Sequence, residues 1–403
     1  MKIVISTPNI NLNISKAVGT LKKLNYLDTF WTTFYFPFNL KFLKKRYYRE
    51  IKYKFVKFNL FKEIMKKIFI ILKLKKFYYK DEDIFSIDSI SKDLDKKVAK
   101  YLSKNKSINI VYSYEDCSKE SFKVAKSKNI KTIYDLTSPY WRLKKNILEE
   151  ELYLQPDWNL SSTEVLADNK CVIKDEELNL SDQIIVASTF AAKSLELLKI
   201  KNKPDIEIVP YGIDFPEKQI INNRDTNEKF KIFFAGRPTL SKGIQYVIQS
   251  LEKVDFPWEI KIAGSIPENP SKISKKMSTF FKDARCEFLG QISNYDLLQR
   301  MKKSHVFLFP SLFEGFGQVL LESISCGLPV ITTYNTAGPD IIENNKNGFL
   351  TPIRDINKTT QILNNLYENE EMRKSIAENA FLSMNKFSWT NYQKKLSKII
   401  KPE

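Results

Sequence analysis

The stretch that decides the fold is residues 307–322, which read FLFPSLFEGFGQVLLE. An apolar run ends at Ser311, a short loop with two glycines follows, and an amphipathic pattern begins near Phe316. This order predicts a buried strand, a tight loop and a helix. Gly315 and Gly317 let backbone N–H groups approach a ligand, and the start of the helix adds free donors and the positive end of its dipole. The stretch therefore predicts an anion site at the carboxyl end of a parallel strand.

Two carboxylates frame the same loop. Glu314 precedes the expected helix, and Glu322 lies about two turns inside it. Carboxylates accept hydrogen bonds from vicinal hydroxyls, which sugars and riboses both carry. In isolation such a pair would more often be one dipole-stabilising and one solvent-facing glutamate. Next to a strand end and two glycines, the pair favours binding of one long, hydroxylated ligand.

A second motif, residues 234–243, reads FAGRPTLSKG. Another apolar run ends there, and Arg237 and Lys242 follow it. Arginine suits bidentate contact with phosphate, and lysine supplies a point charge. Because carboxyl ends of parallel strands share one edge of a sheet, we expect these cations near the glycine loop.

Short apolar runs alternate with helical patterns along the chain, which predicts an α/β fold with parallel sheets. A proline- and glycine-containing segment, 209–216, is expected to be a linker. We therefore expect a first Rossmann-like domain over 1–210, a second over 211–387, and a last helix, 388–403, that returns to the first domain. The expected strands are 2–6, 108–113, 131–136, 183–187, 230–235, 258–263, 286–289, 306–309 and 329–332.

The composition describes a basic globular protein of 403 residues with 43% hydrophobic residues and a net charge of +18. Part of this charge can be compositional, since lysine is abundant throughout. The four cysteines, at 117, 171, 286 and 326, form no C-x-x-C pair, which disfavours structural zinc and disulfides. The start of the chain shows no signal peptide, and no apolar run is long enough to span a bilayer. We therefore expect a cytoplasmic protein.

Residues 41–80 differ from the rest because they combine 15 Lys or Arg with 11 Phe or Tyr and only two acids. The segment predicts a basic and aromatic helical insertion. Such a surface suits the headgroup region of an anionic membrane, which would place the protein on the inner face of that membrane. An ordinary amphipathic insertion and a single-stranded nucleic-acid site are the alternatives.

Taken together, these motifs resemble retaining glycosyltransferase family 4 of the GT-B fold, in which two Rossmann-like domains face each other across a cleft. The resemblance is specific over residues 183–385. It rests on Gly236-Arg237 with Lys242-Gly243, on 288–290, on 309–311, and on Glu314 with Glu322. The stretches 209–214, 327–331 and 347–349 continue it.

The resemblance implies a role for each matched residue. Arg237 and Lys242 would hold the donor diphosphate, Glu314 would contact the transferred sugar, and Glu322 would bind the ribose. The other donor-binding residues would be Gly236, Gly264, Gln291, Ile292, Ser311, Gly315, Phe316 and Gly317. Neither a metal nor a cofactor is expected, because the cations and the helix start would stabilise the leaving diphosphate.

The first domain departs from the family pattern, since it lacks a glycine-rich loop after its first strand and a histidine near the cleft. His305, the chain's one histidine, lies in a strand pattern of the second domain and is expected to be structural. The region corresponding to the missing histidine holds Asp135, Trp141 and Arg142, which we predict to contact the acceptor.

The expected function is transfer of a sugar from a nucleoside-diphosphate donor to a glycan or lipid-linked acceptor, in cell-surface polysaccharide or lipopolysaccharide synthesis. A nucleotide-sugar epimerase of GT-B-like shape is an alternative. A non-catalytic, basic nucleic-acid-binding protein is another, although we expect no nucleic-acid partner.

Overall fold

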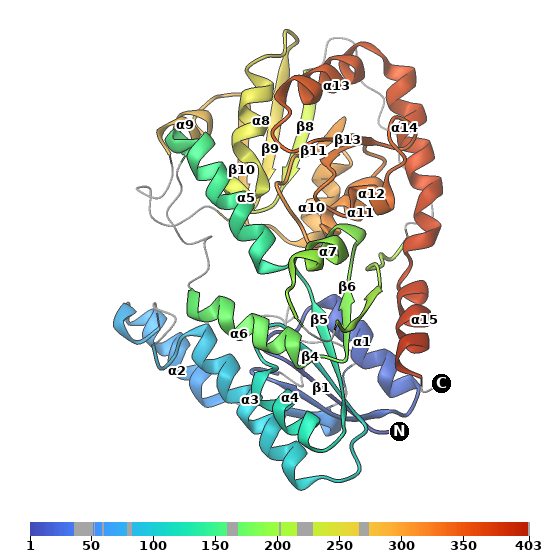
Figure 1. Ribbon diagram of the computed structural model, residues 1–403. Helices are drawn as coiled ribbons and strands as arrows, with labels where there is room; N and C mark the ends of the chain where they lie inside the picture. Colours follow the sequence, from blue (N-terminus) through green and yellow to red (C-terminus); the bar gives the residue numbers. More distant parts are fainter. Residues whose placement is uncertain are drawn as a thin grey trace.

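The computed structural model describes residues 1–35, 51, 53–58, 60–78, 83–158, 168–200, 203–215, 229–265 and 274–401. Two parallel sheets, each accompanied by helices, lie one above the other in Figure 1. The α/β organisation predicted from the alternating pattern is confirmed.

Within the described residues, the first sheet has seven parallel strands in the order β3-β2-β1-β4-β5-β6-β7. The strands are β1 (Ile3–Thr7), β2 (Leu27–Thr32), β3 (Val56–Phe58), β4 (Ile110–Tyr114), β5 (Lys131–Leu136), β6 (Gln183–Val186) and β7 (Asp205–Ile208).

Both faces of this sheet are covered, as the alternation of buried side chains along β1 shows. Ile3 and Ile5 belong to one apolar cluster and Val4 to another. The first cluster contains α1 and α15, and the second contains α3 and α4. A parallel sheet buried on both faces explains why its strands read as continuous apolar runs. The helices are α1 (Leu12–Lys23), α2 (Leu60–Ile71), α3 (Ile87–Lys104), α4 (Lys119–Ser127), α5 (Trp141–Leu154), α6 (Asp168–Asn179) and α7 (Thr189–Ser194).

The second sheet has six parallel strands within the described residues, in the order β10-β9-β8-β11-β12-β13. They are β8 (Phe230–Ala235), β9 (Trp258–Ala263), β10 (Cys286–Gly290), β11 (Val306–Phe309), β12 (Val330–Thr333) and β13 (Phe349–Thr351). The helices are α8 (Ile244–Leu251), α9 (Lys275–Phe280), α10 (Asn294–Met301), α11 (Gln318–Ser325), α12 (Gly338–Ile341), α13 (Ile356–Glu368) and α14 (Glu370–Ser383), and α15 (Trp389–Ile400) ends the described helices.

The chain crosses from one domain to the other twice, and the two crossing segments lie side by side. Ile213 N donates a hydrogen bond of 2.8 Å to Phe387 O, so the outgoing linker runs beside the returning segment. A Cβ on Gly212 would lie 2.4 Å from Trp389 N, which explains a glycine at the crossing. Beyond it, α15 packs against α1 of the first sheet, as Figure 1 shows.

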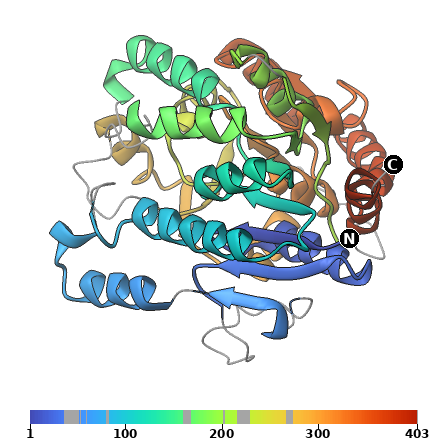
Figure 2. The same cartoon turned by 60° about the horizontal axis from the view of Figure 1, so that its bottom comes forward.

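The expected basic and aromatic insertion lies partly outside the described residues, namely at 41–50, 52, 59, 79 and 80. Its described part is not helical throughout, because β3 pairs with β2 before α2 begins. Figure 2 shows α2 on the outer edge of the first domain, beyond α3. No helix within the described residues is both long and apolar enough to cross a bilayer.

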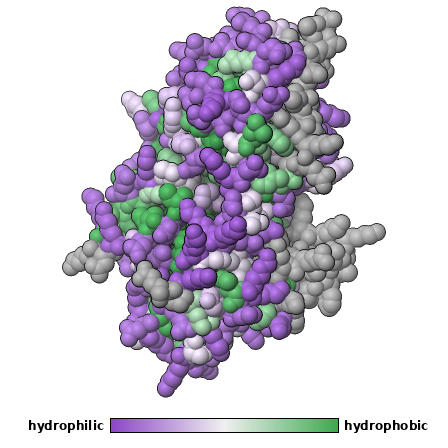
Figure 3. Space-filling model, turned by 90° about the vertical axis from the view of Figure 1, so that its right-hand side faces the viewer, coloured by the Kyte–Doolittle hydropathy of each residue, from purple (hydrophilic) through white to green (hydrophobic). Residues whose placement is uncertain are grey.

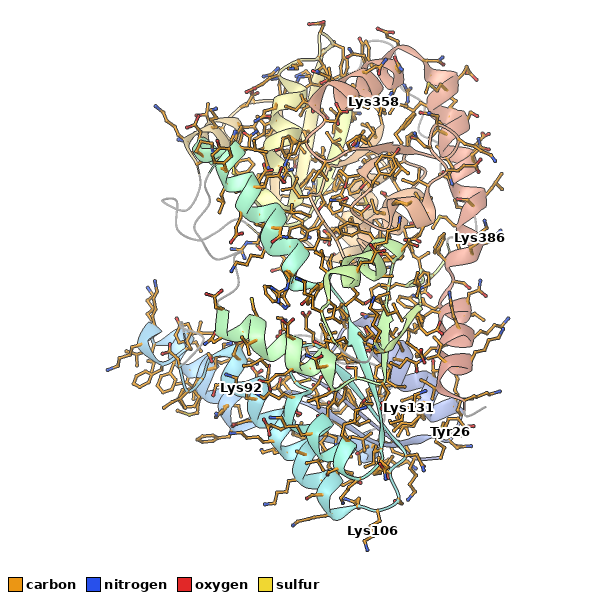
Figure 4. All side chains as sticks on the ribbon, in the orientation of Figure 1. Tyr26, Lys92, Lys106, Lys131, Lys358 and Lys386 are labelled. Atoms are coloured by element: carbon orange, nitrogen blue, oxygen red, sulfur yellow. The ribbon has the colours of Figure 1, made fainter. Side chains whose placement is uncertain are left out.

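Positive charge is spread over the surface of both domains. Figure 4 labels Lys92, Lys106, Lys131, Lys358 and Lys386 on well-separated elements, and all five are exposed. Figure 3, a view of the side on which α14 and α15 lie, shows a mainly hydrophilic face with hydrophobic atoms in scattered groups.

Candidate active site

Three neighbouring strands of the second sheet bring the motifs together. Strands β9, β8 and β11 are adjacent and parallel, so Ala263, Ala235 and Phe309 all end at one edge. Beyond this edge lies a cavity of about 420 Å³. Its lining includes Gly236, Lys242, Gly264, Gln291, Ile292, Glu314, Gly315, Phe316, Gly317 and Glu322, together with Thr137 and Tyr211.

The loop between β11 and α11 is shaped by its two glycines. Gly317 has φ +82°, a left-handed conformation that favours glycine, and it precedes the first turn of α11. A Cβ on Gly315 would lie 2.0 Å from Thr137 O, so only glycine allows the first domain to come this close. No side chain caps α11, and Leu320 N donates to Gly317 O over 2.9 Å. Gln318 and Val319, which precede Leu320, line the cavity, so this end of the helix faces a ligand there.

The cavity also holds an ion pair. Lys242, at the end of the turn that follows β8, donates from Nζ to Oε1 of Glu314. Both side chains are largely buried, with 27% and 16% exposed respectively. The pair places one positive and one negative group on the wall next to the glycine loop, where an anion with an attached sugar would meet both.

Glu322 lies deeper along α11 and is oriented by a second helix. Asn294, the first residue of α10, donates from Nδ2 to Glu322 Oε1 over 2.8 Å. Burial raises the pKa of Glu322, and the hydrogen bond from Asn294 opposes that rise. One carboxylate oxygen is thus held by the protein, while the residue faces the cavity.

Two residues of the predicted donor site do not line the cavity. Ser311 is buried and donates to Ser241 O at 2.9 Å and Phe313 O at 3.1 Å, so it supports the loop from behind. Arg237 follows β8 as expected, but its side chain is exposed and is not part of the cavity lining.

The second domain also matches a known protein family. Residues 215–382 match the model of the family glycosyl transferases group 1. The second domain belongs to this family.

Two curated relatives and one solved structure illustrate the likeness. An uncharacterized glycosyltransferase of Methanocaldococcus jannaschii is 30% identical over 213 residues, which are 52% of this chain and 56% of the relative. The capsular polysaccharide biosynthesis glycosyltransferase CapM of Staphylococcus aureus is 29% identical over 189 residues, which are 44% of this chain and 49% of CapM. The chain thus spans about half the length of these curated relatives.

The solved structure extends the likeness to both domains. The crystal structure of Anabaena HepE in complex with UDP-glucose aligns with a TM-score of 0.66 at 14% identity, covering 99% of each chain. At this identity the match concerns the fold, and the fold is GT-B.

Contacts from the first domain reach the group 1 glycosyl transferase domain at the glycine loop and at α12. Ser188 Oγ donates to Gly315 O over 2.6 Å, and Thr189 N donates to Asp340 Oδ2 over 2.9 Å. Neither contact was predicted, because the partners are 127 and 151 residues apart and Ser188-Thr189 carries no motif. Thr137 and Tyr211, which line the cavity, were also missed as site residues, although both lie in stretches that the sequence analysis had identified.

The predicted acceptor residues lie outside this cavity. Trp141 Nε1 and Arg142 both bind Asp175 of α6, at 2.6 and 2.9 Å, and the Arg142 guanidinium lies 4.3 Å from the Trp141 ring centroid. Asp135 is buried and accepts a hydrogen bond from Tyr112. Burial raises the pKa of Asp135 to about 7.

His305 is structural in this fold, as expected. It is buried directly before β11, and its Nδ1 accepts a hydrogen bond of 3.0 Å from Lys231 N.

Proposed function

We propose that this protein is a retaining glycosyltransferase that moves a sugar from a nucleoside-diphosphate donor to a glycan or lipid-linked acceptor. The observation that carries this proposal is the shared cavity of Lys242, Glu314, the glycine loop and Glu322. The lysine and the glycine loop suit a diphosphate, and the two carboxylates suit the hydroxyl groups of a hexose and of a ribose. The capsule-synthesis relative supports a role in cell-surface polysaccharide or lipopolysaccharide synthesis.

The proposed chemistry follows from charge. When the bond between the sugar C1 and the β-phosphate oxygen breaks, negative charge builds on the departing diphosphate. Lys242 and the N-terminal N–H groups of α11 stabilise this charge, and Arg237 joins them once the donor is bound. We propose that this arrangement makes a metal unnecessary.

Retention of configuration requires attack from the face that the diphosphate leaves. The acceptor hydroxyl oxygen forms the new bond to C1, and its proton passes to the departing phosphate oxygen. Glu314 contacts the transferred sugar and holds Lys242 in place before the donor arrives. In this scheme Glu322 binds the ribose, and the backbone around Gln291 and Ile292 contacts the base.

A uridine diphosphate sugar is the first donor to test, because HepE was solved with UDP-glucose. We place the reaction in the cytoplasm, on the inner face of a membrane, which is where a lipid-linked acceptor would be met.

The deciding experiment incubates the protein with UDP-, GDP- and ADP-sugars and measures thermal stabilisation and nucleotide release. We expect one donor class to stabilise the fold. Release of its nucleoside diphosphate should fall on the order of 100-fold in Arg237→Ala. Lys253→Ala, which changes an exposed lysine of the same domain, is the matched control.

Two results would contradict the proposal. If an epimeric sugar formed from the donor without any acceptor, the protein would be an epimerase. If Arg237→Ala and Glu314→Gln both kept full activity, the assigned site would be wrong.

A further inference from the structure

Helix α2 turns an apolar stripe toward solvent. Phe61, Ile64, Ile68 and Ile71, which we call the α2 stripe, follow the spacing i, i+3, i+7 and i+10 and so share one face of the helix. Their exposed fractions are 68%, 46%, 40% and 77%. Leu72, directly after the helix, is exposed as well.

The opposite face of α2, which meets the domain, carries the polar contacts. Lys62 Nζ donates to Ser89 Oγ at 2.9 Å and forms an ion pair with Asp93 at 2.8 Å. Glu63 Oε1 accepts a hydrogen bond of 3.0 Å from Thr33. A surface helix normally buries its apolar stripe and exposes its charges. Helix α2 has the opposite orientation, because its polar contacts face the domain and the α2 stripe faces solvent. An exposed apolar stripe of this kind indicates a binding surface for an apolar partner.

The charge next to the stripe indicates the kind of partner. Residues 64–80 contain six lysines and no acid. Lys67, Lys73, Lys75 and Lys76 are exposed at or just beyond the end of α2. Lysines beside exposed aliphatic side chains match a surface that is apolar inside and negatively charged outside.

We propose that the α2 stripe inserts into the headgroup region of an anionic lipid bilayer, with the neighbouring lysines on its phosphates. The helix would lie in the plane of the interface, consistent with its place on the outer edge of the first domain in Figure 2. This proposal goes beyond the proposed transferase activity and does not depend on it.

Two other partners fit the surface less well. A second copy of this chain would bring the same lysines face to face, and like charges across an interface oppose association. Single-stranded nucleic acid would need free aromatic faces for stacking. Among the described residues, however, Phe69 is engaged with Phe77 and Phe85, at centroid distances of 4.6 and 5.0 Å, and the stripe itself is mainly aliphatic.

The test is cosedimentation of the full chain with phosphatidylcholine vesicles that contain or lack phosphatidylglycerol. The triple variant Ile64→Ser, Ile68→Ser and Ile71→Ser should lose binding to the anionic vesicles on the order of 100-fold. Because the three side chains are exposed, the fold should survive, which circular dichroism and the melting temperature check.

Matched variants test whether the effect depends on where the substituted side chains lie or only on their chemical type. Tyr153→Ser, Val172→Ser and Leu382→Ser remove three exposed apolar side chains elsewhere and should leave vesicle binding unchanged. Lys73→Gln, Lys75→Gln and Lys76→Gln should weaken binding to anionic vesicles. The same change at Lys92, Lys106 and Lys131, which are also exposed, should have a smaller effect. Added salt should weaken binding of the wild type.

Several results would overturn the proposal. The proposal would be wrong if the stripe variant bound anionic vesicles as the wild type does, or if the wild type bound pure phosphatidylcholine equally well. Self-association that the stripe variant abolishes, without vesicle binding, would identify a second copy as the partner. Tighter binding to a single-stranded oligonucleotide than to vesicles would identify nucleic acid. Donor stabilisation, measured on the same samples, keeps these outcomes separate from the proposed transferase activity.

Discussion

Lys242 and Glu314, 72 residues apart in the chain, form an ion pair on the wall of the cavity at the carboxyl edge of the second sheet. Each follows a different strand of that sheet, β8 and β11, and these strands are neighbours. The cation that we propose for the donor diphosphate is therefore paired with a carboxylate in this structure. Removing either partner should affect binding and catalysis differently.

Glu314→Gln is expected to lower kcat on the order of 100-fold or more while leaving UDP affinity unchanged or increased. Glutamine keeps the size of the side chain but removes a negative charge from the neighbourhood of the diphosphate. Lys242→Ala should instead weaken UDP binding about tenfold or more, since it deletes the cation and leaves the carboxylate facing the anion. Calorimetry with UDP and initial rates of transfer separate the two effects.

Lys253→Ala serves as the control for charge alone, because Lys253 is exposed on the same domain. Equal loss of UDP affinity in Glu314→Gln and Lys242→Ala would contradict the assignment of opposite roles.

The central strands of the fold could be predicted from the sequence because they are buried on both faces. β5, β8, β9 and β11 have the bounds expected from their apolar runs. The strands β2, β3, β7 and β13 were missed. β7 is an edge strand in which Asp205 and Glu207 interrupt the apolar pattern, and β13 has only three residues, which is too short to show periodicity.

The second-domain part of the site was predictable for a similar reason. Lys242 and Glu314 follow strand ends, Glu322 lies on the helix after one of these strands, and parallel strands bring such positions to one edge. Partners that come from segments without a motif could not be predicted. The hydrogen bonds of Asn294 to Glu322 and of Ser188 to Gly315 depend on the packing of whole elements, which no local pattern encodes.

Asn294→Ala is expected to weaken UDP binding about tenfold, because it frees the Glu322 carboxylate from the orientation set by its 2.8 Å hydrogen bond. Pyrophosphate has no ribose, so its affinity should not change. Asn294→Asp should weaken UDP binding further, since a second carboxylate would repel Glu322. Competition binding with UDP and pyrophosphate measures both affinities.

Asn357→Ala, another exposed asparagine of the same domain, should affect neither ligand. A parallel loss of UDP and pyrophosphate affinity in Asn294→Ala would show that Asn294 acts on the fold and not on ribose recognition.

Glu151→Ala is expected to destabilise the protein by about 3 kcal/mol. Glu151 lies on α5 and is fully buried, and its carboxylate accepts hydrogen bonds from Gln245, Tyr246 and Arg354 of the second domain at 2.7–2.8 Å. Its removal deprives each of these three side chains of a buried acceptor. Denaturant unfolding measures the change.

Glu150→Ala is the matched comparison, because Glu150 also binds Arg354, at 2.8 Å, but its side chain is 57% exposed. This surface pair should contribute about 1 kcal/mol or less. Equal destabilisation by the two variants would contradict the role assigned to the buried carboxylate.

Asp135 should make the stability of the first domain fall as pH rises. Burial raises its pKa from 3.8 to about 7, and the hydrogen bond from the Tyr112 phenol only partly opposes that rise. The folded state therefore keeps a proton that the unfolded chain releases. This stabilisation is fully present below pH 3.8 and is lost as pH rises to about 7, by up to about 4 kcal/mol.

Asp135→Asn keeps the shape of the side chain and an oxygen for Tyr112 but cannot ionise. Relative to the wild type, this variant should therefore gain stability between about pH 5 and about pH 8. Burial also raises the pKa of Glu177, to about 8, so ionisation of Glu177 likewise lowers the stability of the folded state as pH rises. Because Glu177 is present in both proteins, the difference in their denaturation midpoints isolates Asp135. A difference that does not change with pH would show that Asp135 is ionised in the folded protein throughout this range.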